Sequence, residues 1–291
     1  RCRRGDGRSI IPTQPKALNV MKSPNHLRLD LMSSKQIAEY LQRSDLAILP
    51  VGCTEFHGPL MPLGTDTLQD YAMALALAEE WNCVCLPPIP YVFTGASEFW
   101  PGTISISPED SIAYIKAVSK SAISAGFHRL VISASHGPMG FMAEMVIRSI
   151  FRETGEVPIF ISPYNRMIAE LEKDFGRGSE DINTLGAVTF LGLEGCFDPH
   201  APRDVEAEFS DPSMARLRSH GARMPWIFNA DHQHTGFRTD ISAQDGPRAA
   251  EALRRAAATL RDLPKHYDEY RNFVKRQLQE RRWERDDVWT A

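Results

Sequence analysis

The sequence lacks the features that mark membrane-bound, secreted and nucleic-acid-binding proteins. No window approaches the about 18 consecutive apolar residues of a membrane-spanning helix, and no apolar run of signal-peptide length follows the arginines at the start of the chain. The 33 lysines and arginines stand against 37 acidic residues, and the net charge of −4 is far from the positive field that binding to a phosphate backbone requires. We therefore expect a cytoplasmic protein that binds neither nucleic acid nor membrane.

Cysteine is also scarce, and its placement does not suit a disulfide framework or a zinc ribbon. The number of cysteines is odd and no two of them form a CxxC pair. They are scattered, mostly within apolar segments, which predicts reduced thiols in a reducing compartment. They are Cys2, Cys53, Cys83, Cys85 and Cys196.

No internal repeat or low-complexity linker divides the 291 residues, which are enough to bury one large core. Short apolar runs predict buried strands, and segments of helical periodicity lie between them. This alternation is typical of an α/β fold in which a mostly parallel sheet is flanked by helices on both faces. The predicted strands are residues 46–51, 84–86, 129–134 and 159–161.

We divide the chain into an irregular N-terminal arm (1–25), one α/β domain (26–264) and a charged C-terminal helix (265–291). Within the domain, residues 176–229 mix glycine, proline and acidic residues, so we interpret them as a loop-rich insertion. The last helix has a narrow apolar stripe that is expected to lean on the domain or on another subunit. The stripe consists of Tyr270, Phe273, Val274 and Leu278.

Candidate metal ligands follow the first predicted strand. Glu55 and His57 are two residues apart, so on an extended chain they point the same way, and Asp66 precedes the next helix. Carboxylate and imidazole groups at the carboxyl edge of a parallel sheet outline a metal site. On spacing alone the alternative stays open that Asp66 caps its helix and His57 is a hydrogen-bonded loop histidine.

The third strand adds a histidine at the same edge. His136 follows the strand directly, and Gly137 after it lets the backbone approach a bound group. A single histidine after a strand is more often structural, but two strand ends that supply ligands to one place favour a metal site.

These segments resemble the creatininase (creatinine amidohydrolase) family. The run PVGCTEFHGPLMPLGTDT (50–67) is similar to the family pattern PxGSxEQHGPHLPLGTDT, WPGTIS (100–105) to FPGTIS, and GFHRLVISASHG (126–137) to GFRRIVIVNGHG. The segment that begins at Pro247 loosely resembles the family's closing GDPxxATxEKG element. The likeness covers about residues 30–165 well, and its first block is highly specific.

The resemblance implies a three-layer parallel α/β fold, a homo-oligomer that is commonly a hexamer, and hydrolysis of a cyclic amide or formamide at a divalent-metal site. Zn²⁺ or Mn²⁺ is then the expected cofactor, with one or two ions per chain. The residues that fall on the family's metal ligands are Glu55, His57, Asp66 and His136, with Asp66 in the bridging position.

The chain departs from the family pattern elsewhere. The family's HAGxxETS element, whose histidine shuttles protons and whose glutamate completes the second metal site, aligns best with TLGAVT (184–189), which has threonine at both positions. Pro138 stands where creatininase itself has a glutamate after the metal histidine. His234, in DHQHTG with Asp240 behind it, is the candidate catalytic replacement, a polar surface turn is the alternative, and Glu194 is a further candidate.

Three functions fit this sequence. The first is a metal-dependent amidohydrolase that acts on a C–N bond of a small molecule through a metal-activated water. The second is a relative that has lost hydrolysis and uses the metal as a Lewis acid for a lyase, cyclisation or isomerisation step, which the missing HAGxxETS pair favours. The third is a scaffold without activity, which the four retained ligands disfavour, because a protein that does not use a metal would not be expected to keep them together.

Overall fold

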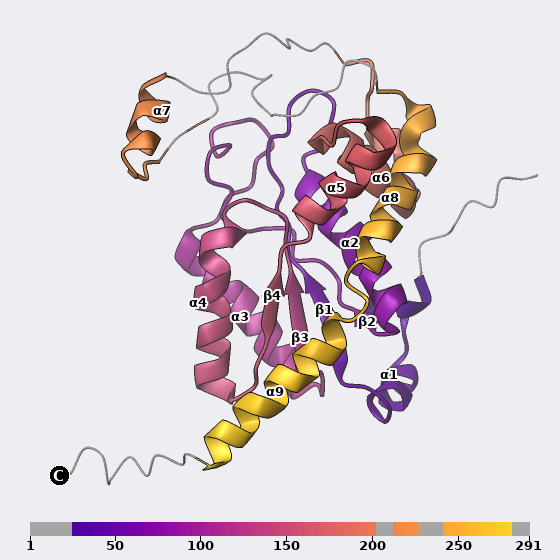
Figure 1. Cartoon of the computed structure of the whole chain (residues 1–291), viewed down its shortest axis with the longest axis vertical. Coiled ribbons are helices and arrows are strands. Elements are labelled where there is room, and N and C mark those ends of the chain that lie inside the picture. Colours follow the sequence, from indigo (N-terminus) through magenta and orange to yellow (C-terminus); the bar gives the residue numbers. More distant parts are fainter. Residues whose placement is uncertain (1–24, 202–211, 226, 228–240, 281–291) are drawn as a thin grey trace, which may run out of the picture.

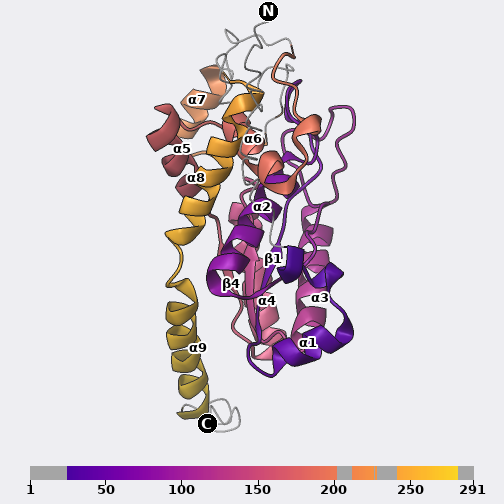
Figure 2. The same cartoon turned by 90° about the vertical axis from the view of Figure 1, so that its right-hand side faces the viewer.

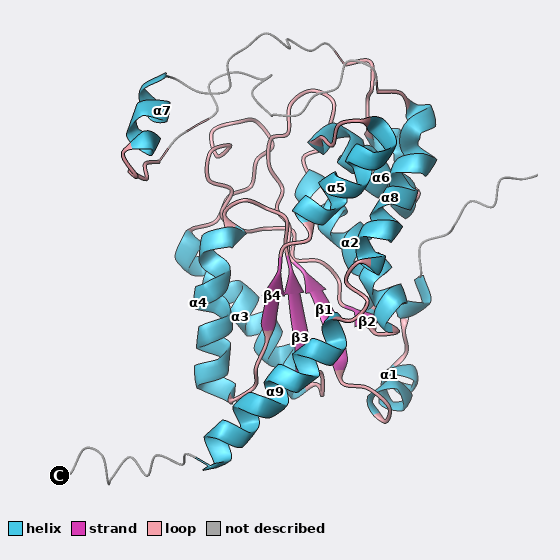
Figure 3. Cartoon of the chain, in the orientation of Figure 1, coloured by secondary structure: helices cyan, strands magenta, loops and turns pink. Residues whose placement is uncertain are grey.

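The computed structural model describes residues 25–201, 212–225, 227 and 241–280. In this part of the chain four strands form one sheet in the order β2-β1-β3-β4, and every neighbouring pair is parallel (Figure 3). The prediction of a parallel α/β fold is therefore confirmed. The strands are β1 (Leu46–Pro50), β2 (Val84–Cys85), β3 (Arg129–Ser133) and β4 (Ile159–Ile161).

Helices surround the sheet (Figure 1). Sequence signals account for several of their starts: Ser33 caps the first with a capping box, and Ser107 caps the third, in which Pro108 occupies the first turn. In the described residues the α-helices are α1 (Ser34–Leu41), α2 (Thr65–Trp81), α3 (Pro108–Ser124), α4 (Met139–Thr154), α5 (Tyr164–Phe175), α6 (Glu180–Leu191), α7 (Pro212–Ser219), α8 (Gly246–Ala258) and α9 (Leu263–Glu280).

The two faces of the sheet belong to two hydrophobic clusters. Along β1, Ala47 and Leu49 face the cluster that contains α3 and α4, whereas Leu46 and Ile48 face the cluster of α2 and α8. This is the alternation of side chains along a strand, and helices cover both faces of the sheet, so β1 is apolar throughout. The turned view places α3 on one side of the molecule and α8 and α9 on the other (Figure 2).

Helix α6 lies inside the stretch that the sequence predicted to be a loop-rich insertion. Nearly all of its residues are buried, and it packs against α2 and α8. A helix that is buried on every side shows no apolar stripe, so periodicity gave no sign of it. At Gly186 a Cβ atom would lie 2.8 Å from the carbonyl carbon of Ala249, so this glycine lets α6 and α8 approach closely.

Helix α9 crosses the amino ends of the strands (Figure 1). The buried Tyr267 donates a hydrogen bond to the Val157 carbonyl (2.6 Å), and Asp268 pairs with Arg129 at the start of β3 (2.8 Å). Beyond these contacts Tyr270, Phe273 and Leu278 are about half exposed. None of the described helices is both long and apolar enough to cross a membrane.

Candidate metal centre

The loop between β1 and α2 is held by contacts along its length. A Cβ atom at Gly52 would lie 2.3 Å from the Cα atom of Thr67, so only glycine lets the loop pass the first turn of α2. The hydroxyl of Thr67 donates to the carbonyl of Cys53 (2.9 Å), and the amide of Glu55 donates to the carbonyl of Leu63 (2.8 Å). The loop therefore presents its side chains from a fixed backbone.

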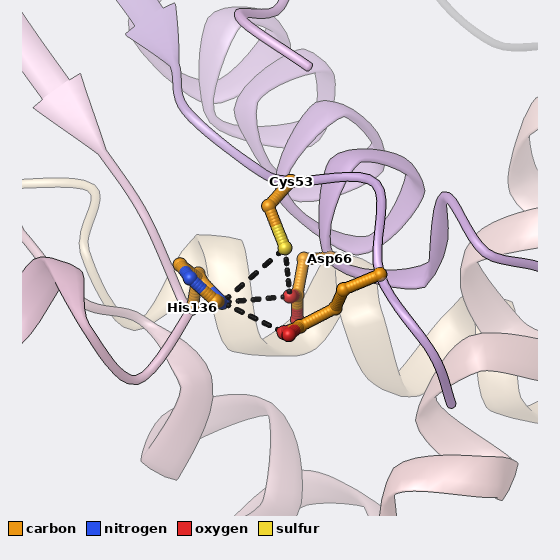
Figure 4. Close-up of side chains that lie close together, drawn as sticks. Cys53, Asp66 and His136 are labelled. Carbon is orange, nitrogen blue, oxygen red and sulfur yellow. Dashed lines mark hydrogen bonds and ion pairs between the residues drawn. The ribbon is translucent and has the colours of Figure 1, made fainter. Parts of the chain in front are cut away.

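One group of possible metal ligands comes from this loop and from the end of β3 (Figure 4). His136 Nδ1 lies 2.8 Å from Asp66 Oδ2 and 3.1 Å from Glu55 Oε1. The thiol of Cys53 lies 3.1 Å from the same Asp66 oxygen. All four residues are buried, and their ligand atoms lie within 4.8 Å of one another.

A second group shares Asp66 with the first. His57 Nε2 lies 3.5 Å from Asp66 Oδ1 and 3.8 Å from Glu180 Oε1, at the start of α6. These three ligand atoms also lie within 4.8 Å of one another. Asp66 thus turns one carboxylate oxygen to each group, which is the geometry of a bridging ligand between two ions.

Backbone carbonyls fix the orientation of both histidines. Phe93 O accepts a hydrogen bond from His136 Nε2 (2.9 Å), and Glu55 O accepts one from His57 Nδ1 (3.0 Å). Each ring therefore turns its unprotonated nitrogen to the ligand groups when it is neutral, as metal-binding histidines do. Ser97 in turn donates to Oε2 of Glu55, the carboxylate oxygen that does not face His136.

The buried carboxylates of the cluster favour positive charge beside them. Burial alone would lower the pKa of His57, but the carboxylates of Asp66, Glu180 and Glu55 raise it to about 9. Burial likewise opposes the charge of Asp66, yet His57 and His136 hold its pKa well below the usual range. Against the effect of burial, the carboxylates of Asp66 and Glu55 likewise raise the pKa of His136, and no lysine or arginine is among the described residues that line this pocket.

A carboxyl group behind the cluster supports the end of β3. Asp70 Oδ2 accepts a hydrogen bond from the Ser135 amide (2.7 Å), and Asp70 Oδ1 accepts one from the Ser135 hydroxyl (3.0 Å). Burial raises the pKa of Asp70 to about 8, even though these hydrogen bonds act to lower it. Because Ser135 precedes His136, this contact fixes the place at which the histidine leaves the strand.

A cavity of about 530 Å³ opens above the two groups. Its floor is polar and formed by the proposed ligands, and its walls are largely apolar and aromatic, with Phe93, Phe141 and Tyr164 among them. Burial and the nearby carboxylates of Glu180 and Asp66 raise the pKa of Tyr164 above its ordinary value, so its hydroxyl keeps its proton. The size and lining suit a small molecule.

The structure brings together the four residues that the sequence singled out: Glu55, His57, Asp66 and His136. His234 lies outside the described residues. Glu194 is exposed on a short 3₁₀ helix (Glu194–Cys196) and is not among the cavity's lining residues. Pro138 lines the cavity without offering a ligand atom.

Sequence reasoning missed Glu180 and Cys53 as possible ligands. Thr184, the first threonine of the segment aligned with the family's HAGxxETS element, lies in α6, where its hydroxyl donates to the Glu180 carbonyl and accepts from Gln69 Nε2. The only local signal near Glu180 is the run Ser179-Glu180-Asp181, since serine followed by acidic residues is typical of a helix start.

The comparison with known proteins agrees with this geometry. A family model described as creatininase, creatinine amidohydrolase, matches residues 30–186. The chain belongs to the creatininase family. The matched region includes both ligand groups, from Cys53 to Glu180.

Relatives of established name cover only part of the chain. It is 33% identical over 150 residues to 3-dehydro-scyllo-inosose hydrolase of Thermotoga maritima, a match that covers 50% of this chain and 46% of the relative. It is 35% identical over 98 residues to the mycofactocin precursor peptide peptidase of Mycolicibacterium smegmatis, covering 32% and 39%. The chain spans about half the length of the curated relatives that it matches.

Among solved structures, a creatininase described with manganese superposes with a TM-score of 0.58 at 17% identity, covering 81% of this chain and 98% of that one. At this identity the likeness concerns the fold.

Proposed function

We propose that this protein is a metal-dependent hydrolase that cleaves a C–N bond of a cyclic amide, a formamide or a related small molecule. The observation that carries the proposal is Asp66, which turns one oxygen to each of two ligand groups at the floor of a cavity. Membership of the creatininase family supports the reaction class, and the hydrolase and peptidase names of the relatives point to water as co-substrate.

The residues present fit a pair of divalent ions. Imidazole and carboxylate ligands suit Zn²⁺ and also Mn²⁺. In this proposal the first ion would be held by Glu55, His136 and Oδ2 of Asp66. The second would be held by His57, Glu180 and Oδ1 of Asp66. The carboxylates of Glu55, Asp66 and Glu180 are largely buried together, an arrangement that is costly unless cations balance their charge.

A bound divalent ion would lower the pKa of a water molecule and polarise the carbonyl group of the substrate. The chain's own residues orient and enclose the reaction. Phe93, Phe141 and Tyr164 provide an apolar and aromatic wall beside the ligands, and the Tyr164 hydroxyl is available to donate a hydrogen bond to a substrate oxygen.

The leaving nitrogen needs a proton, and we assign this step to His234. It is the catalytic residue of the proposal because His234-Thr235-Gly236 echoes the family's HAG. A general acid or base of this kind contributes about 10²–10⁴-fold to the rate.

One observation favours a second function. Among the described residues that line the cavity, the histidines and carboxylates are the proposed ligands themselves. A creatininase-like site without a proton shuttle is poorly equipped to expel an amine, and it would suit a lyase, cyclisation or isomerisation step with the ion as Lewis acid.

A panel of lactams, imides and formamides, incubated with the zinc- or manganese-loaded enzyme in heavy-oxygen water, separates the two functions. Hydrolysis places the heavy oxygen in the product, which mass spectrometry detects as an added mass. A product that carries no heavy oxygen would establish the Lewis-acid alternative. A protein that binds no divalent ion after dialysis against zinc and manganese would rule out both.

We also propose that the protein works as a homo-oligomer, with a hexamer as the assembly that the family resemblance favours. The aromatic side chains of Tyr270 and Phe273 support this proposal, since both lie about half exposed on α9.

A further inference from the structure

Cys53 lies inside the first ligand group. Its side chain is completely buried, and Sγ points at Asp66 and His136 (Figure 4). Sγ lies 3.1 Å from Asp66 Oδ2 and 3.5 Å from His136 Nδ1. The backbone of Cys53 is fixed by Thr67 and by the close passage at Gly52, so the direction of the thiol is built into the loop.

The distances match those of a metal site with a sulfur ligand. With zinc–sulfur and zinc–nitrogen bonds of about 2.3 and 2.0 Å, sulfur and nitrogen in a tetrahedral site lie about 3.5 Å apart. Cys53 Sγ and His136 Nδ1 are 3.5 Å apart. The two oxygens that face His136 Nδ1, at 2.8 and 3.1 Å, need to move outward by about 0.6 and 0.3 Å to reach the about 3.4 Å of the same geometry.

The two ligand groups differ in the number of protein ligand atoms that they offer. The first offers four protein ligand atoms, from Cys53, Glu55, Asp66 and His136, and the second offers three. Glu55, Asp66 and His136 line the cavity, as do all three members of the second group, whereas Cys53 lies behind them and does not line it. Four protein ligands are typical of a closed structural zinc site, and three with an open position are typical of a catalytic one.

We propose that Cys53 binds the first ion as a thiolate and that the two sites divide the work. In the first site protein atoms fill all four ligand positions, and the site selects zinc, because a thiolate is a soft ligand that favours zinc over manganese. The second site holds the ion that faces the substrate and exchanges more freely. This inference rests on the proposed metal centre, and the thiol proton is released to solvent when the first ion binds.

Two spectroscopic measurements test the proposal without relying on activity. The chelated protein, loaded with one equivalent of Co²⁺, should show a thiolate-to-cobalt charge-transfer band in the near ultraviolet. X-ray absorption at the zinc edge of the wild-type protein, with one equivalent of Zn²⁺, should show a sulfur neighbour at about 2.3 Å. The second measurement needs no substitution, so it stands even if a variant fails to fold.

Cys53→Ser is the test variant, because it restores the serine of the family pattern at this position. It should lose the charge-transfer band and bind the first zinc at least about 100-fold more weakly, since even outer residues of metal sites contribute 10- to 100-fold. Cys196→Ser, which removes an exposed thiol, is the matched control and should keep the band.

The outcomes separate this inference from the proposed function. A protein that binds cobalt and zinc but shows neither the band nor the sulfur neighbour has a metal centre in which Cys53 is only a hydrogen-bond donor to Asp66, and the inference is overturned. A band that persists in Cys53→Ser overturns it as well. A protein that binds neither ion overturns the proposed function and the inference with it.

Discussion

His57 donates its Nδ1 hydrogen to the backbone carbonyl of Glu55, 3.0 Å away. This hydrogen bond fixes the His57 ring relative to the backbone of Glu55, although the two side chains belong to different ligand groups. The carboxylate of Glu55 faces His136, and the Nε2 atom of His57 faces Glu180. A spacing of two residues in the sequence is thus a structural unit that sets the geometry of two proposed ion sites at once.

Substitution of the bridging carboxylate should cost more metal than substitution of a histidine. Asp66→Ala should lose both ions, because each Asp66 oxygen serves one group, whereas His57→Ala should keep about one ion per chain. Elemental analysis after metal-replete expression measures this. Equal losses in the two variants would mean a single-ion site, and His200→Ala, at an exposed histidine, controls for general effects.

Glu180→Gln should remove the second ion and leave the first. The amide keeps the shape of the side chain but loses its charge, so affinity at the second site should fall at least about tenfold. Glu194→Gln is the matched control, since Glu194 is exposed and does not line the cavity. If both variants bind the same amount of zinc as the wild type, Glu180 is not a ligand.

The metal-free protein should lose stability between about pH 6.5 and pH 9. The pKa of His57 rises from 6.5 to about 9 on folding, so its protonated ring stabilises the fold fully below pH 6.5, and this contribution, about 3 kcal/mol, disappears as the pH approaches 9. Asp70, whose pKa is raised to about 8, acts in the same direction.

Thermal unfolding of chelated protein across this range measures the effect. A Tm that stays level from pH 6.5 to 9 would contradict it. His57→Gln should flatten the profile, and His200→Gln should not. Apparent zinc affinity should rise by up to about tenfold per pH unit over the same range, because the ion displaces a proton from the imidazole.

The exposed aromatic side chains of α9 should support an assembly. Phe273→Asp is expected to reduce the mass measured by light scattering at micromolar concentration, because a charge would be buried in the contact. Leu217→Asp, at a similarly exposed leucine on α7, is the control. A wild-type particle with the mass of one chain would show that the protein does not assemble through this helix.

His234→Ala should abolish most turnover while metal content is unchanged, with a loss in kcat of about 10²–10⁴-fold. A general acid or base acts on the barrier of the reaction and not on ion affinity. His232→Ala, two residues away in the sequence, is the natural control. An unchanged kcat in His234→Ala would mean that another group, or the substrate itself, transfers the proton. It would also strengthen the Lewis-acid alternative.

Local sequence signals predicted most of the fold. The apolar run at β1 and the capping residues Ser33 and Ser107 gave strands and helices close to their observed bounds. Glu55, His57 and Asp66 could be found because they lie within 12 consecutive residues, in the loop after β1 and the first turn of α2. His136 could be found because parallel strands end at one edge of the sheet.

The remainder of the site depends on contacts that a single sequence does not encode locally. Glu180 comes from a helix that is buried on all sides, so neither periodicity nor spacing connects it with His57. Cys53 follows an apolar strand, and a cysteine there looks like an ordinary small core residue. Its role depends on a side-chain direction that only the folded loop fixes.

The shared use of Asp66 also has a topological meaning. Asp66 and His136 are 70 positions apart, and Glu180 lies further along the chain on a different layer of the fold. Ions bound at both faces of one carboxylate would cross-link the first strand's loop, the third strand and the start of α6, much as a disulfide closes a long loop and lowers the entropy of the unfolded chain. Metal binding at the proposed active site would therefore also stabilise the position of α6 relative to the sheet.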